Sequence, residues 1–267
     1  MNKTAIPFFK YQGAGNDFVI IDNRNGIFPA ATGTAQIRRL CDRHFGIGAD
    51  GLILLETCEG YDFKMVYYNS DGRLSTMCGN GGRCIAAFAH YLEVFDKECN
   101  FLAVDGSHKA VMFTDDWVEL EMRPVSIIER HQGYYFIDTG SPHYVSFVDH
   151  MEQVEVVAQG RSIRNSPPFA KEGVNVNFVQ LRQEGIEVAT YERGVEDETL
   201  SCGTGVTASA IAYYLENEEK ESTTVKITTK GGQLAVKFTP TESGFEDVWL
   251  IGPAEMVFRG EVELGIT

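Results

Sequence analysis

The sequence predicts an α/β protein made of two related halves. The first observation is a short motif that occurs twice, since Cys78-Gly79-Asn80-Gly81 and Cys202-Gly203-Thr204-Gly205 each precede an apolar helix. The second is the spacing: Cys202 follows Cys78 by 124 residues, close to half of the 267-residue chain. The third is a series of short strands with alternating apolar residues around each motif. These observations together predict two similar domains that each offer one thiol.

Helices and strands are expected in the same order in both halves. Residues 34–44 are predicted as a helix because apolar residues keep helical spacing and Gly46 ends it. A matching helix is predicted near residues 151–160, and residues 124–132 are predicted as the crossover between the halves. The predicted strands cover residues 8–12, 18–22, 50–55, 63–68, 101–104, 109–113, 117–122, 134–138, 144–148, 174–181, 186–192, 225–229, 233–238, 248–251 and 255–258. No long flexible linker is found, so we expect closely packed halves with Cys78 and Cys202 facing each other across a cleft.

Each motif combines a reactive thiol with an anion site. The first backbone N–H groups of a helix have no intrahelical partner and the macrodipole is positive there, so a thiolate or a bound carboxylate is favoured. Glycines beside the sulfur let a ligand approach the backbone closely. The alternative is a pair of buried helices whose first cysteine is only a small apolar filler. Two copies separated by half the chain favour the functional interpretation.

Composition restricts the ligand class. The chain has 23 Lys and Arg against 38 Asp and Glu, a net charge of -15, which opposes nonspecific binding to nucleic acid or to an anionic membrane surface. We therefore expect a small-molecule ligand. The first residues, 1–11, lack the continuous apolar segment of a signal peptide, and no stretch approaches the ~18 apolar residues of a membrane span. The sequence thus predicts a soluble cytoplasmic protein.

The six cysteines show no C-x-x-C pair and no Cys/His spacing suited to zinc. In a chain of this length without an export signal, they are expected to be reduced thiols, and no metal site is predicted. Four of them are interpreted as structural filler, namely Cys41, Cys58, Cys84 and Cys99.

Two thiols on opposite sides of a bound molecule can invert a carbon centre. One thiolate removes a proton, and the other thiol delivers a proton to the opposite face. No motif indicates an organic cofactor. Because a carbon acid beside a carboxylate ionises with difficulty, the site must stabilise negative charge on that carboxylate, and two helix N-termini suit this task. Asn80 and Thr204, two residues after each cysteine, can add polar side chains.

Four segments together resemble the diaminopimelate epimerase family. They are Gly15-Asn16-Asp17-Phe18, Cys78-Gly79-Asn80-Gly81 with Arg83-Cys84, Glu192-Arg193-Gly194 and Cys202-Gly203-Thr204-Gly205, and matching segments extend from near Phe8 to near Glu261. The resemblance implies a cofactor-independent isomerase that interconverts LL- and meso-diaminopimelate in lysine and cell-wall precursor synthesis.

The resemblance also implies an architecture. Two pseudo-symmetric halves each form a mainly antiparallel, barrel-like sheet around a central helix, with the active site in the cleft between them. The halves would be residues 1–125 and 126–254, and residues 255–267 would return to the first half. Family members are commonly homodimers, so a homodimer is expected.

Site residues are implied position by position. Cys78 and Cys202 would be the two acid/base residues, and His143 and Glu192 would tune their protonation. The backbone at the start of each motif helix would hold the carboxylate at the reacting centre. The residues implied to bind substrate are Asn16, Asn69, Gly79, Asn80, Asn175, Glu192, Arg193, Gly203 and Thr204. Arg193 suits a distal carboxylate because guanidinium binds carboxylate in a bidentate manner.

Two positions depart from the family's pattern. Ser141 precedes Pro142-His143, where many members have Asn, and its hydroxyl is a candidate for the same contact. Gly51 stands where many members carry Gln, and it has no side chain to offer. Two other functions stay open from the sequence: a racemase of another amino acid such as proline or hydroxyproline, and a noncatalytic thiol redox or binding protein. Two reactive thiols across a narrow cleft would also be sensitive to oxidants.

Overall fold

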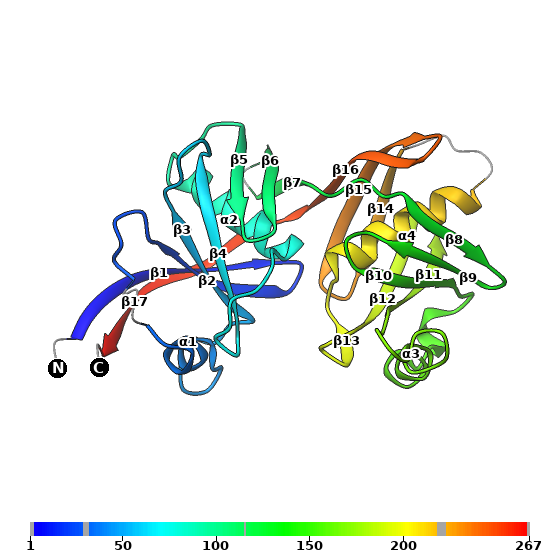
Figure 1. Cartoon of the computed structure of the whole chain (residues 1–267), viewed down its shortest axis with the longest axis horizontal. Coiled ribbons are helices and arrows are strands. Elements are labelled where there is room, and N and C mark those ends of the chain that lie inside the picture. The colour runs from blue at the N-terminus through cyan, green and yellow to red at the C-terminus, as the bar shows by residue number, and fades with distance from the viewer. Residues whose placement is uncertain (1–2, 29–31, 115, 218–222, 266–267) are drawn as a thin grey trace. The chain divides into compact units, whose positions relative to one another are not determined.

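A computed structural model describes residues 3–28, 32–114, 116–217 and 223–265 of the protein (Figure 1). The chain divides into two compact units. Unit 1 comprises Met1–Leu120 together with Pro253–Thr267, and unit 2 comprises Glu121–Gly252.

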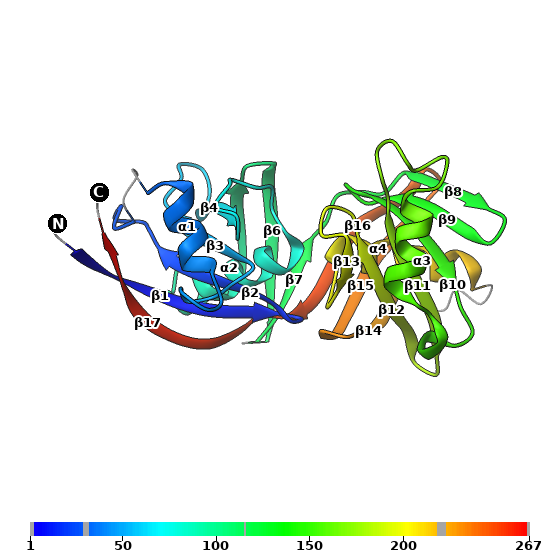
Figure 2. The same cartoon turned by 90° about the horizontal axis from the view of Figure 1, so that it is seen from below.

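Unit 1 is a curved, mainly antiparallel sheet with two helices. Its elements are β1 (Lys3–Gly13), β2 (Asn16–Asp22), α1 (Thr34–Cys41), β3 (Gly51–Glu56), β4 (Phe63–Asn69), α2 (Gly79–Tyr91), β5 (Glu98–Ala103), β6 (Gly106–Thr114), β7 (Trp117–Glu121) and β17 (Glu255–Gly265). Adjacent strands pair in the order β17, β1, β2, β3, β4, β5, β6, β7, and only β2–β3 and β4–β5 are parallel. Helix α2 packs against β1, β2, β3, β4, β6 and β17, and is the central helix of the unit. Strands β1 and β17 lie side by side in both views (Figures 1 and 2).

Unit 2 repeats this plan. Its elements are β8 (Ile127–His131), β9 (Tyr134–Asp138), β10 (Pro142–Phe147), the 3-10 helix η1 (Met151–Gln153), α3 (Val156–Arg164), β11 (Asn175–Arg182), β12 (Gly185–Glu192), β13 (Asp197–Thr199), α4 (Gly203–Glu216), β14 (Thr224–Thr229), β15 (Gly232–Thr241) and β16 (Gly244–Pro253). The parallel pairs are β10–β11 and β12–β14, the counterparts of β2–β3 and β4–β5. Helix α4 packs against β9, β10, β11, β12, β14 and β15, as α2 does in unit 1.

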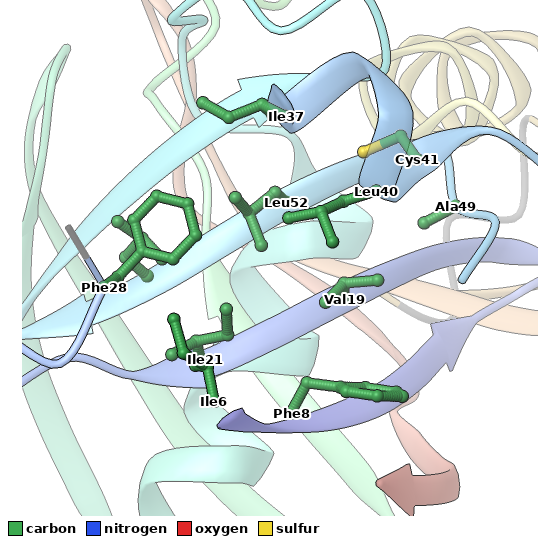
Figure 3. Close-up of a cluster of buried hydrophobic side chains, with 11 residues drawn as sticks. Ile6, Phe8, Val19, Ile21, Phe28, Ile37, Leu40, Cys41, Ala49 and Leu52 are labelled. Atoms are coloured by element: carbon green, nitrogen blue, oxygen red, sulfur yellow. The ribbon is translucent and has the colours of Figure 1, made fainter. Parts of the chain in front are cut away.

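Each sheet presents alternate residues to two helices. In unit 1, Val19, Ile21 and Leu52 form a cluster of buried apolar side chains with Leu40 of α1 (Figure 3). Leu54 belongs to the same cluster. Each such side chain contributes about 1.5–3 kcal/mol when fully buried. The residues between them on each strand face the opposite side, where α2 lies. The same alternation in unit 2 leaves one sheet face for α3 and the other for α4.

The expected α/β class with two pseudo-symmetric halves is confirmed, but several predicted elements differ. The strands predicted over 8–12 and 255–258 are longer, as β1 and β17, and β13 was not predicted. The first helix ends at Cys41 rather than His44. The helix expected over 151–160 is a 3-10 turn followed by α3, which begins only at Val156. The expected crossover 124–132 contains strand β8, whose mostly exposed side chains gave no alternation to detect. Across the described ranges, no helix is long and apolar enough to cross a membrane.

Candidate active site

Both motif cysteines occupy the residue that caps the start of a helix. Cys78 (φ -96°, ψ 133°) precedes α2 and Cys202 (φ -120°, ψ 110°) precedes α4 in the same extended conformation. The first intrahelical bonds match: Gly82 N–H donates to Cys78 O at 2.7 Å, and Val206 N–H donates to Cys202 O at 2.9 Å. Each sulfur therefore lies where the helix carries its positive end, which favours a thiolate or a bound anion.

Two side-chain amides adjoin Cys78. The Cys78 thiol donates to Asn16 Oδ1 with Sγ and oxygen 3.4 Å apart, and Asn80 Nδ2 donates to the same oxygen at 3.4 Å. Asn16 comes from the start of β2, and Asn80 comes from the first turn of α2. The structure thus brings together three residues that the sequence places 62 and 64 positions apart.

A buried guanidinium lies behind these amides. Arg83 is fully buried on α2, and its Nη2 donates to Asn80 Oδ1 at 2.8 Å while Nε donates to Pro253 O at 3.4 Å. Its Nη1 has no hydrogen-bond partner among the described residues. Burial lowers the pKa of Arg83 to about 10, so the group is still a cation at neutral pH. An unpaired buried cation stabilises an anion close to it.

The Cys202 thiol has hydroxyl and backbone groups around it. Its Sγ lies 3.5 Å from Thr204 Oγ1, and either atom can be the donor. Thr139, which is buried, donates to Thr204 O at 3.0 Å and so ties the loop after β9 to the first turn of α4. A Cβ at Gly205 would lie 2.4 Å from Asn177 Oδ1 and 3.3 Å from Cys202 Cβ. Glycine is therefore required for the helix to approach this close to the sheet.

His143 is a neutral imidazole whose tautomer is fixed by its neighbours. Asn177 Nδ2 donates to Tyr144 O at 3.1 Å, and because a carbonyl only accepts, this assigns the nitrogen end of the amide. The same Nδ2 lies 3.0 Å from His143 Nδ1, which must then be the acceptor. Thr190 Oγ1 donates to Asn177 Oδ1 at 2.9 Å and completes the chain. The imidazole proton therefore sits on Nε2.

The environment keeps His143 uncharged. Burial and, to a smaller extent, the nearby Arg193 charge lower its pKa to about 3. Its Nε2 has no hydrogen-bond partner among the described residues although the side chain is fully buried. Since Nε2 carries the proton, the group that satisfies it must be an acceptor, such as a thiolate or a carboxylate.

Asn175 holds two segments of unit 2 together. Its Nδ2 donates to Ser141 Oγ at 2.8 Å and to Pro142 O at 3.2 Å, and its Oδ1 accepts from Arg193 N–H at 2.9 Å. Ser141 therefore lies where the sequence expected it, beside the binding set, with its hydroxyl proton still available as a donor. The Arg193 guanidinium donates to Glu172 O at 2.9 Å.

The remaining expected positions lie at strand ends. Asn69 is exposed at the end of β4 opposite Gly51, and Glu192 is half-buried at the end of β12. A Cβ at Gly51 would lie 2.4 Å from Tyr67 Cε2 and 2.5 Å from Tyr68 O. A larger residue there would thus require Tyr67 to move.

Sequence reasoning missed several residues that orient the site. They are Asp50, Arg83, Thr139, Asn177 and Thr190. Asn177 had a detectable signal, since Asn175 and Asn177 are two polar residues on one face of the first, buried part of β11, which is otherwise apolar. Arg83 had one too, as a charge inside an apolar helix. Three of the other cysteines are buried, and burial raises the pKa of Cys41 to about 11 and of Cys84 and Cys99 to about 12, so these stay thiols.

Comparison with known proteins agrees with a site built from two matched half-sites. The family model for diaminopimelate epimerase matches residues 8–128 and 135–257. The diaminopimelate epimerase of Flavobacterium psychrophilum is 51% identical over 95% of this chain and 99% of its own length. The chain belongs to the diaminopimelate epimerase family. It is therefore an isomerase-type enzyme, as the sequence predicted.

Solved structures of low identity share the fold of this family member. A PhzF-family phenazine biosynthesis protein from Bacillus anthracis matches with a TM-score of 0.74 at 13% identity, over 97% of this chain and 99% of that one. A hydroxyproline epimerase from Agrobacterium vitis matches with a TM-score of 0.67 at 14% identity, over 99% and 93% of the two chains. At these identities the likeness concerns the fold.

Proposed function

We propose that this protein interconverts LL- and meso-diaminopimelate without an organic cofactor, as part of lysine biosynthesis. The observation that carries the proposal is the doubled half-site: Cys78 and Cys202 cap two helices of the same design, each with polar side chains beside the sulfur. Membership of the family, at 51% identity to a named diaminopimelate epimerase, supports the choice of substrate.

The reaction needs one base and one acid. The thiolate of one cysteine takes the proton from the α-carbon and becomes a thiol, and the thiol of the other gives its proton to the opposite face and becomes a thiolate. The carbon centre is inverted, and the two cysteines have exchanged protonation states. The reverse direction uses the same residues with the roles exchanged. Because the reaction needs one cysteine protonated and the other deprotonated, the pH dependence of activity should reflect the coupled titration of the two.

Charge that builds on the α-carboxylate needs prepositioned donors. The N–H groups at Gly79-Asn80 and Gly203-Thr204 begin α2 and α4 and suit this role. His143 contributes as a donor through Nε2–H, because its Nδ1 is engaged by Asn177 and its pKa is far below neutral. It is thus suited to stabilise an anion and unsuited to act as a base at neutral pH.

The distal part of the substrate would select the diamino diacid. We assign Arg193 to its carboxylate, with Asn16, Asn69, Asn175 and Glu192 as further binding groups. Glu192 also stands beside this set as a candidate for adjusting thiol protonation, as the family resemblance implies. Asn175 forms hydrogen bonds with Ser141, Pro142 and Arg193. It would therefore also fix the positions of these residues around the substrate.

Isotope exchange tests the proposal directly. Incubation with LL-diaminopimelate in deuterated water, without pyridoxal phosphate, should yield meso product that carries α-deuterium. Mass spectrometry with chiral separation measures both. Absence of exchange with folded protein would contradict the proposal.

Two other functions make different predictions. The fold shared with the hydroxyproline epimerase suggests a racemase of proline or hydroxyproline as an alternative. If the proposed function is correct, a panel of substrates should show turnover only for a diacid with two amino groups. A noncatalytic thiol redox or binding protein predicts that replacing Cys78 or Cys202 leaves turnover unaffected.

We also propose that the protein is a cytoplasmic homodimer. Strand β17 pairs antiparallel with β1, and its Met256, Val257 and Phe258 are exposed. Exposed apolar residues gathered on one strand favour association with a second copy. Sedimentation velocity should give about twice the monomer mass, and Val257→Lys should shift the protein to the monomer.

A further inference from the structure

The orientation of the Asn16 amide is set by a carboxylate. Asn16 Nδ2 donates to Asp50 Oδ2 at 2.5 Å. A carboxylate is acceptor-only when ionised, so the nitrogen end of the amide must face it. The oxygen end then faces the opposite way, toward Cys78 Sγ at 3.4 Å.

The same orientation follows independently from the other end of the network. Arg83 donates only, so its Nη2 requires the oxygen of Asn80 at 2.8 Å. The Asn80 nitrogen therefore points away from Arg83, and it lies 3.4 Å from Asn16 Oδ1. A flipped Asn16 amide would oppose Asp50 at one end and Asn80 at the other. An anion and a cation thus enforce the same arrangement from two sides.

We infer that Asp50 is a positioning residue, which acts through the Asn16 amide to hold Cys78 in its protonated, hydrogen-bond-donating form. The Asn16 oxygen can accept the thiol hydrogen, but it would repel a thiolate. With a flipped amide, two N–H groups would face the sulfur and would favour the thiolate instead. Asp50 decides between these two arrangements without touching Cys78.

Asp50 is itself held firmly. Arg43 Nη2 donates to Asp50 Oδ1 at 2.8 Å and to Asp17 Oδ1 at 2.7 Å. The Asp50 backbone N–H donates to Asp17 O at 2.9 Å, and Asp17 N–H donates back to Asp50 Oδ2 at 3.2 Å. The buried Lys10 pairs with Asp17 at 2.6 Å. Although burial opposes it, hydrogen bonds from Arg43 and Lys10 hold the pKa of Asp17 well below its usual range, so Asp17 stays ionised.

Charged groups of opposite effect therefore surround Cys78. Arg83 on the same helix favours the thiolate, and the Asp50–Asn16 pair from the sheet side favours the thiol. The neighbouring thiol of Cys84 stays protonated because burial raises its pKa to about 12. Of the other acidic groups nearby, Asp17 and Glu255 help to raise the pKa of Cys84, and Asp105 Oδ1 accepts from the N–H of Met77 at 3.4 Å. If the proposed function holds, this balance keeps Cys78 able to donate a proton while remaining able to lose one.

Cysteine alkylation as a function of pH tests the inference without any substrate. The rate at which iodoacetamide modifies Cys78 is followed by mass spectrometry of the peptide that contains it. Asp50→Asn keeps the shape of the side chain but can present either end to Asn16, so the amide is free to invert. We expect the pH midpoint of Cys78 alkylation to fall by about one unit. An unchanged midpoint would overturn the inference.

A double-mutant cycle separates orientation from the simple loss of a charge. In an Asn16→Ala background no amide remains to be oriented, so Asp50→Asn should leave the midpoint unchanged. If Asp50 acted only through its electric field, the same shift would appear in both backgrounds, and that result would refute the role assigned here. Because no step requires turnover, these outcomes are independent of whether the protein epimerises diaminopimelate.

A matched control exists in the same unit. Asn23 Nδ2 donates to Glu56 Oε1 at 2.9 Å, which is another amide held by a carboxylate. Glu56→Gln should leave the Cys78 midpoint unchanged. If Asp50 variants do not fold, nuclear Overhauser contacts in the unaltered protein decide the matter: contacts between the Asn16 Nδ2 protons and the Cys78 β-protons would overturn the inference, and their absence with contacts on the Asp50 side would support it.

Discussion

The sheet surface beneath the first turn of α2 is apolar. The Cβ that Gly81 lacks would lie 3.3 Å from Ile53 Cδ1 and 3.4 Å from Phe18 Cζ. Ile53 pairs with Tyr67 across β3 and β4, and the ring of Tyr67 packs edge-on against Phe18 at 5.9 Å. The start of the helix that follows Cys78 therefore rests on Ile53 and Phe18, and Tyr67 packs beside Phe18.

The corresponding surface beneath α4 is polar. Gly205 follows Cys202 by three residues, as Gly81 follows Cys78, and its added Cβ would meet Asn177 Oδ1 and Thr190 Oγ1. Asn177 pairs with Thr190 across β11 and β12. His143 opposes the first residue of β11, as Phe18 opposes the first residue of β3. The set His143, Asn177 and Thr190 thus takes the places of Phe18, Ile53 and Tyr67.

This difference shows where the two halves have diverged. Apolar packing stabilises a helix without specifying chemistry, whereas a buried polar chain is costly unless every member is satisfied. Unit 2 contains such a chain with one unsatisfied end, the Nε2–H of His143. Helix α2 of unit 1 carries the buried Arg83 at the position where α4 has Thr207. We interpret the two halves as one scaffold with different means of controlling a thiol.

The largest effects should come from the cysteines that the two halves share. Cys78→Ala and Cys202→Ala should each reduce kcat by about 10²–10⁴-fold, because each removes one of two proton-transfer groups. Steady-state epimerisation measures this. Cys58→Ala, at a half-exposed cysteine outside both motifs, is the control and should retain full activity. A large effect from only one motif cysteine would break the proposed equivalence of the halves.

Reversing the direction of the hydrogen bond between Asn177 and His143 in unit 2 should have the next largest effect. In Asn177→Asp the carboxylate can only accept, so His143 Nδ1 must carry the proton and Nε2 can no longer serve as a neutral donor. We expect kcat to fall by about 10- to 100-fold, and ¹⁵N resonances of the imidazole should report the change of tautomer. Asn165→Asp, on the surface of the same unit, should change neither. An unaltered tautomer would contradict the assignment.

Acid should weaken unit 2 through His143. Its pKa is about 3 in the folded protein and near 6.5 when unfolded, so the unfolded chain binds the proton more readily. The stabilisation is fully present above pH 6.5 and is lost as pH falls toward 3. Between pH 7 and pH 5 the free energy of unfolding should drop by about 2 kcal/mol from this group. Urea titration of His143→Phe, which copies Phe18 of unit 1, should show a pH dependence smaller by that amount.

The sequence was sufficient for the features that local pattern controls. The doubled motif predicted the two related halves and placed each thiol at a helix start, because an N-cap is defined by its immediate neighbours. It did not reveal the Asn16–Asp50 contact, since the orientation of an amide depends on partners 34 residues away. Strand β8 was missed because an exposed edge strand lacks the alternation that buried strands show. Gly205 looked like a loop residue, and only the packing of Asn177 explains it.

The smallest expected effect compares the two helix glycines. Gly205→Ala would drive a methyl group to within 2.4 Å of Asn177 Oδ1, a buried atom fixed by the Thr190 hydroxyl, and should cost about 1–2 kcal/mol through overpacking. Gly81→Ala meets only the flexible ends of Ile53, Met65 and the ring edge of Phe18, at 3.3–3.4 Å. The gain in helix propensity, about 1 kcal/mol, should offset that contact. Urea denaturation of both variants measures the contrast, and equal destabilisation would mean that the polar surface under α4 can shift as easily as the apolar one under α2.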